Sequence, residues 1–132
     1  MMTHRPLTVI AISGHRQLAG DKSKDFDSWR TLARSVGKAV CVWAGPPVVV
    51  SEDNFAVTRR PRQPGFRSLS WAAWAIHTAV EAVRAETRDG RQVVLNGGEQ
   101  WGWVVAATSA ALTHKPWIME IHGSYLDLPA AS

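Results

Sequence analysis

Glycine, histidine and small polar residues follow three apolar segments of this sequence, each where the apolar segment ends. The three groups are Gly14, His15 and Arg16; Asn96, Gly97, Gly98 and Glu99; and His122 with Gly123. Glycine lets a backbone approach a ligand closely, and the first N–H groups of a following helix can bind an anion or a hydroxyl. An exposed imidazole can donate to a hydroxyl or a phosphate. The three groups therefore predict contacts to a small polar ligand.

Each group also has a structural interpretation that stays open. A Gly-Gly pair after a strand is often a tight turn required by sterics, and a lone histidine is often structural. No GxGxxG follows the first apolar segment, and the sequence has no Walker lysine pattern, no GxSxG elbow and no His/Cys cluster with metal-ligand spacing. We therefore expect no metal and no cofactor.

The apolar spacing predicts the elements that position these groups. Short apolar runs predict strands at residues 7–13, 39–44, 92–96 and 117–121, with at least one more edge strand within 48–60. Helical spacing predicts helices at 26–36, 66–87 and 99–114, the first capped by Asp25 and ended by Gly37. Strands that alternate with helices predict an α/β fold: one Rossmann-like domain over residues 1–132, a parallel sheet of about five strands with helices on both faces.

In such a sheet, ligands bind beyond the carboxyl ends of the strands. We expect residues 14–25, 96–99 and 122–127 to gather at that edge. On the two later helices, the residues expected to face the core are Phe66, Leu69, Ala73, Ile76, Val80 and Val83, and then Trp101, Val104, Val105, Thr108 and Leu112. Trp71 and Trp74 fall outside the first stripe, so they cover a second contact or lie at a surface.

The chain has 132 residues, seven tryptophans and a formal charge of +4. Four arginines crowd together, namely Arg59, Arg60, Arg62 and Arg67. They favour an anionic partner or are simply a solvated loop. Nucleic acid is not expected, because the arginines occupy one loop without interleaved aromatics.

Cys41 lies in an apolar run and is interpreted as a core residue. Neither a signal peptide nor a spanning helix is evident, so we expect a cytoplasmic location. If tryptophans lie exposed beside the arginines, they form either the face left open by a missing domain or a patch for the inner face of a membrane.

The stretch from Gln92 to Asp127, QVVLNGGEQWGWVVAATSAALTHKPWIMEIHGSYLD, resembles the end of the N-terminal domain of GT-B glycosyltransferases of the retaining, glycogen-synthase-like kind, family four. There, a strand reaches a small-residue turn, an alanine-rich helix follows, and a lysine-proline step leads into a strand that ends in His-Gly. The earlier strand, loop, helix and strand are similar to the opening of the same domain. The family's glycine-rich loop is replaced here by residues 14–20.

The resemblance implies an acceptor-side domain in which His122 is catalytic and contacts the donor sugar, with Gly97 and Gly98 near the acceptor or sugar. The C-terminal domain, which holds the nucleotide-sugar in the family, is expected to be absent. One hypothesis is half of a split glycosyltransferase that pairs with a separate donor-binding domain and has a glycan or lipid acceptor. The other is a truncated or remnant domain that binds, or docks on a membrane surface or partner, without catalysis. Alone, the chain is expected to be inactive, because transfer needs both substrates aligned between two domains.

Overall fold

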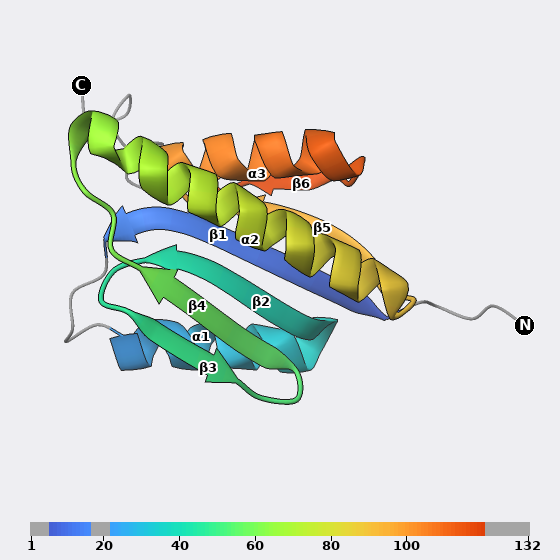
Figure 1. The fold of residues 1–132 in the computed structure, drawn as a ribbon. Coiled ribbons are helices and arrows are strands. Elements are labelled where there is room, and N and C mark those ends of the chain that lie inside the picture. The colour runs from blue at the N-terminus through green and yellow to red at the C-terminus, as the bar shows by residue number, and fades with distance from the viewer. Residues whose placement is uncertain (1–5, 17–21, 121–132) are drawn as a thin grey trace, which may run out of the picture.

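The computed structural model describes residues 6–16 and 22–120, with only the backbone described for residues 15, 16 and 22–25. Strands and helices alternate along most of the chain (Figure 1). Their bounds are β1 (Leu7–Arg16), α1 (Lys22–Val36), β2 (Gly37–Ala44), β3 (Val48–Ser51), β4 (Phe55–Arg60), a short 3-10 helix (Gly65–Arg67), α2 (Ser68–Arg88), β5 (Gln92–Gly97), α3 (Gln100–Thr113) and β6 (Trp117–Met119).

The strands form one six-stranded sheet in the order β3-β4-β2-β1-β5-β6. All neighbouring pairs are parallel except β3 with β4, which is antiparallel. The predicted α/β fold with a mainly parallel sheet is confirmed. The sheet has six strands rather than about five, because both apolar runs within residues 48–60 form strands. The polar turn between them closes the hairpin, with the N–H of Glu52 donating to the carbonyl of Phe55 at 2.8 Å.

Helices cover both faces of the sheet, and each face has its own apolar core. Ile10 and Ile12 of β1 pack with residues of α2 and α3. Ala11, between them in sequence, packs with Phe26 of α1 and with residues of β2 and β4. This alternation is what a strand with a period of two requires when both of its faces are buried. In Figure 1, α1 lies on one side of the sheet, and α2 and α3 lie on the other.

Strands β1 and β5 lie side by side in the sheet, yet the helices that follow them lie on opposite faces. This is the point at which the strand order reverses. In open α/β sheets, ligands bind in the crevice outside the carboxyl ends of such a pair.

Helix α1 differs from its prediction at its start. It begins at Lys22, so Asp25 lies inside the helix and is not its N-cap. Its end agrees with the prediction, because Gly37 has a φ of +127° and begins β2. Strand β1 continues through Gly14, His15 and Arg16, beyond the strand predicted for residues 7–13.

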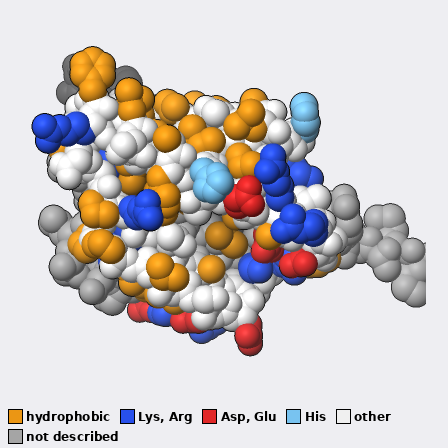
Figure 2. Space-filling view, viewed as in Figure 1, with side chains coloured by type: hydrophobic (Ala, Val, Ile, Leu, Met, Phe, Trp, Pro, Cys, Tyr) orange, Lys and Arg blue, Asp and Glu red, His pale blue; other side chains and the backbone are white. Residues whose placement is uncertain are grey.

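The outer helices bury only part of the apolar stripes that the spacing selected: Val80, Val83 and Val105 are buried, but several larger residues are not. Phe66 is 92% exposed and Leu69 58% exposed, whereas Trp71 is 2% exposed and its indole N–H points to the carbonyl of Trp43 at 3.4 Å. On α3, the buried residues are Gly102, Val105, Ala106, Ser109 and Ala110. The expected core residues Val104 and Leu112 are 52% and 61% exposed. Figure 2 shows the resulting hydrophobic side chains on the surface over α2 and α3.

A polar cluster at the amino ends of the central strands joins α2, β1 and β2 to the residue before β5. The carboxylate of Glu86 on α2 accepts a hydrogen bond from the hydroxyl of Thr8 on β1 at 2.8 Å and pairs with Lys38 on β2 at 2.7 Å. Arg91, next to β5, donates to the Thr8 hydroxyl at 2.6 Å and lies 3.5 Å from the Glu86 carboxylate. This buried cluster lies at the edge of the sheet opposite to the candidate site. Within residues 6–16 and 22–120, no helix is long and apolar enough to span a bilayer.

Candidate functional site at the carboxyl edge of the sheet

Gly14 and Glu99 are in direct contact at the carboxyl ends of β1 and β5. The backbone N–H of Gly14 donates to Oε1 of Glu99 at 2.7 Å, and the N–H of Gly102 donates to the same atom, also at 2.7 Å. Glu99 is therefore the N-cap of α3 and also ties β1 to that helix. Two groups of predicted site residues, distant in sequence, thus lie together as expected.

This contact changes the chemistry expected of the turn. A helix N-terminus attracts anions because its first N–H groups lack partners. Here the carboxylate of Glu99 already takes one of these N–H groups, so an incoming phosphate would compete with it. Glu99 is half-buried, and among its contacts with described residues both hydrogen bonds go to Oε1. No hydrogen bond to its Oε2 atom is found among the described residues.

Glycines allow the close approach of α3 to the strands. A Cβ atom on Gly102 would lie 2.5 Å from the carbonyl oxygen of Ile12, and one on Gly97 would lie 2.7 Å from the carbonyl oxygen of Gly102. A Cβ on Gly98 would make only ordinary contacts, the nearest at 3.4 Å. Gly97 and Gly102 are therefore required by packing, while buried Gly98 could accept a Cβ without a close contact.

Arg62 fixes the same segment from the other side. Its guanidinium donates to the carbonyl of Gly14 and, at 2.7 Å, to the hydroxyl of Ser68, which in turn donates to the carbonyl of Gln63. The peptide groups around Gly14 are thus held by a cation on one side and a carboxylate on the other. Sequence reasoning did not assign Arg62 this role, because only the fold brings it to β1.

The remaining predicted residues have different outcomes. Asn96 is half-buried on β5, in register with Ala11 and Ile118. Only the backbone of His15 and Arg16 is described, and it continues β1. His122 and Gly123 lie outside the described residues.

Glu120 is a further acidic residue near the turn, and the sequence analysis did not include it in the site. A Cβ placed on Gly98 would be 3.7 Å from the Glu120 Oε1 atom. The indole N–H of Trp103 donates to the backbone carbonyl of Glu120 at 3.1 Å, which holds the end of β6 against α3. Two carboxylates, Glu99 and Glu120, therefore lie around the Gly98 backbone.

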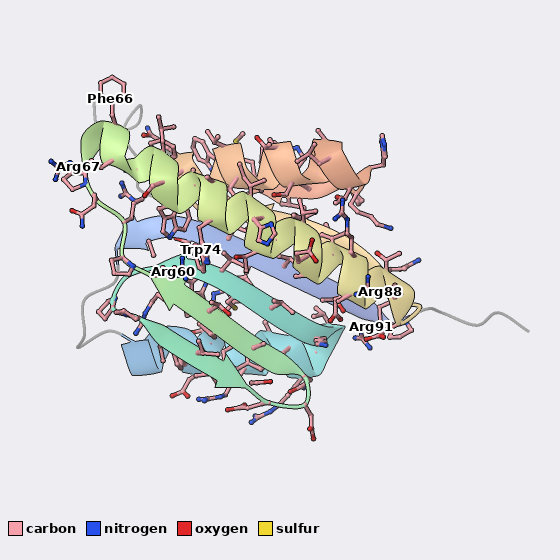
Figure 3. All side chains as sticks on the ribbon, viewed as in Figure 1. Arg60, Phe66, Arg67, Trp74, Arg88 and Arg91 are labelled. Atoms are coloured by element: carbon pink, nitrogen blue, oxygen red, sulfur yellow. The ribbon has the colours of Figure 1, made fainter. Side chains whose placement is uncertain are left out.

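An apolar hollow of about 400 Å³ opens beside this edge, lined by Gly65, Phe66, Leu69 and Trp101. Trp101 connects the hollow to the candidate site, since its Cβ atom would lie 2.5 Å from a Cβ added at Gly14. Phe66 points away from the body of the molecule (Figure 3). The edge thus combines polar acceptors with an adjacent apolar surface.

The four crowded arginines do not form one exposed patch. Arg59 is 2% exposed, with its guanidinium 5.7 Å from the ring of Phe26, and Arg62 is held as described above. Arg60 lies over the ring of Trp74 at 5.2 Å, and only Arg60 and Arg67 are exposed (Figure 3). Arg59 and Arg62 therefore have structural roles, while Arg60 and Arg67 lie at the surface, and the anionic partner expected for the cluster stays a prediction.

Comparison with known proteins gives a likeness at the level of fold. No family model matches this sequence, and the search of the curated proteins finds no match. Among solved structures, the chain is similar to the C-terminal domain of a hydrogenase from Pyrococcus furiosus, with 10% sequence identity and a TM-score of 0.55. The match covers 92% of this chain and 96% of that one. At this identity, the likeness concerns the fold alone.

Proposed function

We propose that the chain is a Rossmann-like sugar-binding domain that accepts a nucleotide-sugar at the carboxyl ends of β1 and β5, as the N-terminal half of a glycosyltransferase. The observation that carries the proposal is the half-buried Glu99 carboxylate, fixed through Oε1 on the N–H groups of Gly14 and Gly102. Carboxylates bind sugar and ribose hydroxyls as hydrogen-bond acceptors, and a fixed carboxylate loses little conformational freedom on binding.

The surroundings of Glu99 support the same ligand class. Half-buried Glu120 offers a second acceptor nearby, since its Oε1 atom would lie 3.7 Å from a Cβ placed on Gly98. The hollow beside Trp101 suits the apolar face of a sugar ring or a base. The glycosyltransferase assignment itself rests on the resemblance of residues 92–127, in which His122 has the catalytic role.

Transfer would require a separate donor-binding domain, because no single α/β sheet provides both walls of an interdomain cleft. The domain by itself binds a sugar ligand and does not transfer it. The second hypothesis, a domain that docks on a partner without any sugar ligand, is favoured by the exposed apolar face of α2 and α3.

Calorimetric titration with UDP-glucose, ADP-glucose and GDP-mannose tests the proposal. We expect heat with at least one of them, and loss of this heat in Glu99→Gln, which keeps the shape of the side chain but weakens the acceptor. The matched control is Glu52→Gln, an exposed carboxylate paired with Arg30 far from this edge. Absence of heat with all three nucleotide-sugars contradicts sugar binding. Heat that persists in His122→Ala contradicts the role taken from the resemblance.

A further inference from the structure

Helix α3 is an outer-layer helix without a single charged side chain. Its fourteen residues, Gln100–Thr113, read QWGWVVAATSAALT. A helix that is apolar all round is normally buried on all sides. Here one side packs on the sheet and α2, while Val104 and Leu112 remain 52% and 61% exposed and Ala111 is exposed as well. The outer side of α3 therefore lacks a covering surface among the described residues.

Helix α2 extends this apolar surface at its start. Leu69 is 58% exposed, the preceding Phe66 is 92% exposed, and Ala73 one turn later is exposed too. We call the exposed apolar residues of the two helices and of the preceding 3-10 helix the outer face; they are Phe66, Leu69, Ala73, Val104, Ala111 and Leu112. Scattered exposed apolar residues need no explanation, but a contiguous set on two adjacent helices indicates an interaction surface.

Basic residues border the outer face at both ends. Arg67 adjoins Phe66 at the start of α2, and Figure 3 shows the two side by side. At the other end, a hollow of about 390 Å³ is lined by apolar Val83 and Leu112 together with Arg84, Arg88 and Lys115. Figure 2 shows Lys and Arg side chains at the margins of the hydrophobic surface.

Carboxylates are few on this side of the molecule. Two exposed ones, Glu81 and Asp89, lie on or directly after α2, and Glu81 pairs with Arg84 at 3.3 Å. In a two-fold contact between two copies, this face would meet the same face of the other copy. Because both ends of the face are basic, basic residues would lie against basic residues whether the helices of the two copies run parallel or antiparallel. The charge therefore disfavours a second copy and favours an anionic partner.

We propose that the outer face of α2 and α3 docks on an anionic lipid bilayer. Phe66, Leu69, Val104 and Leu112 enter the boundary between headgroups and acyl chains, and Arg67, Arg84, Arg88 and Lys115 contact lipid phosphates. An apolar face bordered by cations is the pattern of peripheral membrane binding, which combines apolar burial with attraction to acidic lipids. This proposal does not use Glu99. Phe66 and Leu69 also line the hollow beside Trp101, but none of the residues changed in the test variants below belongs to that hollow.

Vesicle flotation tests the proposal with the full chain. We expect binding to phosphatidylcholine vesicles that contain phosphatidylserine, little binding to phosphatidylcholine alone, and weakening by salt. Removing two cations in Arg88→Gln/Lys115→Gln should lower the affinity about 25-fold, roughly fivefold for each. Its control is Arg34→Gln, an exposed arginine on α1.

A second variant tests the apolar part. Val104→Ser/Leu112→Ser should abolish flotation, whereas Val49→Ser, which changes a residue 78% exposed on β3, should leave it intact. Thermal unfolding checks that each variant is folded. Equal binding to neutral and anionic vesicles, no binding at all, or the same effect in variant and control would overturn the proposal. So would a stable dimer that Val104→Ser/Leu112→Ser converts to monomers, which would make the face a contact between copies.

Discussion

The backbone N–H of Gly14 donates to the carboxylate of Glu99 at 2.7 Å, although the two residues are 85 positions apart in sequence. The same oxygen caps α3 through the N–H of Gly102. One side chain therefore sets both the position of the β1 end and the start of α3. Because the Glu99 carboxylate already binds an N–H group in the first turn of α3, a phosphate at this helix N-terminus would have to compete with it.

Replacing Glu99 with alanine should lower the free energy of unfolding by about 2 kcal/mol, because a cap and a second charge-assisted hydrogen bond are lost. Amide hydrogen exchange at Gly14 and Gly102 should become faster in the same variant. Gln100→Ala, at the exposed next position, is the control and should have little effect. Unchanged exchange at Gly14 would show that Glu99 does not hold β1 in solution.

Gly102→Ala should destabilise the fold by about 2 kcal/mol, because the added Cβ would lie 2.5 Å from a backbone oxygen of Ile12, which cannot move without shifting β1. Gly98→Ala is the matched control, since its Cβ would meet nothing closer than 3.4 Å. Denaturant unfolding compares the two variants. Equal stability of both would contradict the close packing of α3 on β1.

Glu86→Gln should cost about 3 kcal/mol, because the half-buried cations Lys38 and Arg91 would lose their buried counter-charge. Glu81→Gln, which breaks only the exposed pair with Arg84, should cost less than about 0.5 kcal/mol. The comparison uses thermal or urea unfolding at neutral pH. A Glu86→Gln loss no larger than that of Glu81→Gln would contradict a structural role for the cluster.

The buried hydroxyl of Ser109 has no hydrogen-bond partner among the described residues. Ser109→Ala should therefore raise the free energy of unfolding by about 1 kcal/mol beyond the gain of Ser70→Ala, an exposed substitution on α2 that measures helix propensity alone. A loss of stability in Ser109→Ala would reveal a partner such as a buried water.

Burial raises the pKa of the Cys41 thiol well above its ordinary value. The thiol should stay unreactive toward Ellman's reagent in the native protein and react on unfolding. The folded state holds the thiol proton more tightly than the unfolded state does. The contribution of Cys41 to the free energy of unfolding is therefore complete below the unfolded pKa of about 8.5 and is lost as the pH rises above it. Cys41→Ala should remove that part of the alkaline loss; fast labelling of the native protein would contradict this burial.

The sequence predicted the elements well where local chemistry determines them. Gly37 marked the end of α1, and the alternation of strands and helices predicted the mainly parallel sheet. It predicted the core faces of α2 and α3 only in part: Val80, Val83 and Val105 are buried as expected, but spacing by size also selected Leu112, which is 61% exposed. The face that α3 turns toward the sheet depends on how closely the helix can approach the strands, and Gly102 allows the closest contact.

The candidate site was predicted in part for a related reason. The carboxyl-edge rule brought Gly14 and Glu99 together without any knowledge of their contact. Arg62, on the linker before α2, is neither on a strand nor next to one of the three expected segments. Its hydrogen bond to Gly14 depends on where that linker passes, which local sequence does not encode. The same holds for Trp71, whose burial follows from the path of α2 over β2.

The cluster of Glu86, Lys38, Arg91 and Thr8 ties α2, β1 and β2 to the residue that precedes β5, all at the amino ends of the central strands. Strand β1 is therefore held at both ends, by this cluster at its amino end and by Glu99 and Arg62 at its carboxyl end. Loosening one end leaves the contacts at the other in place, so the register of the central strand is set twice.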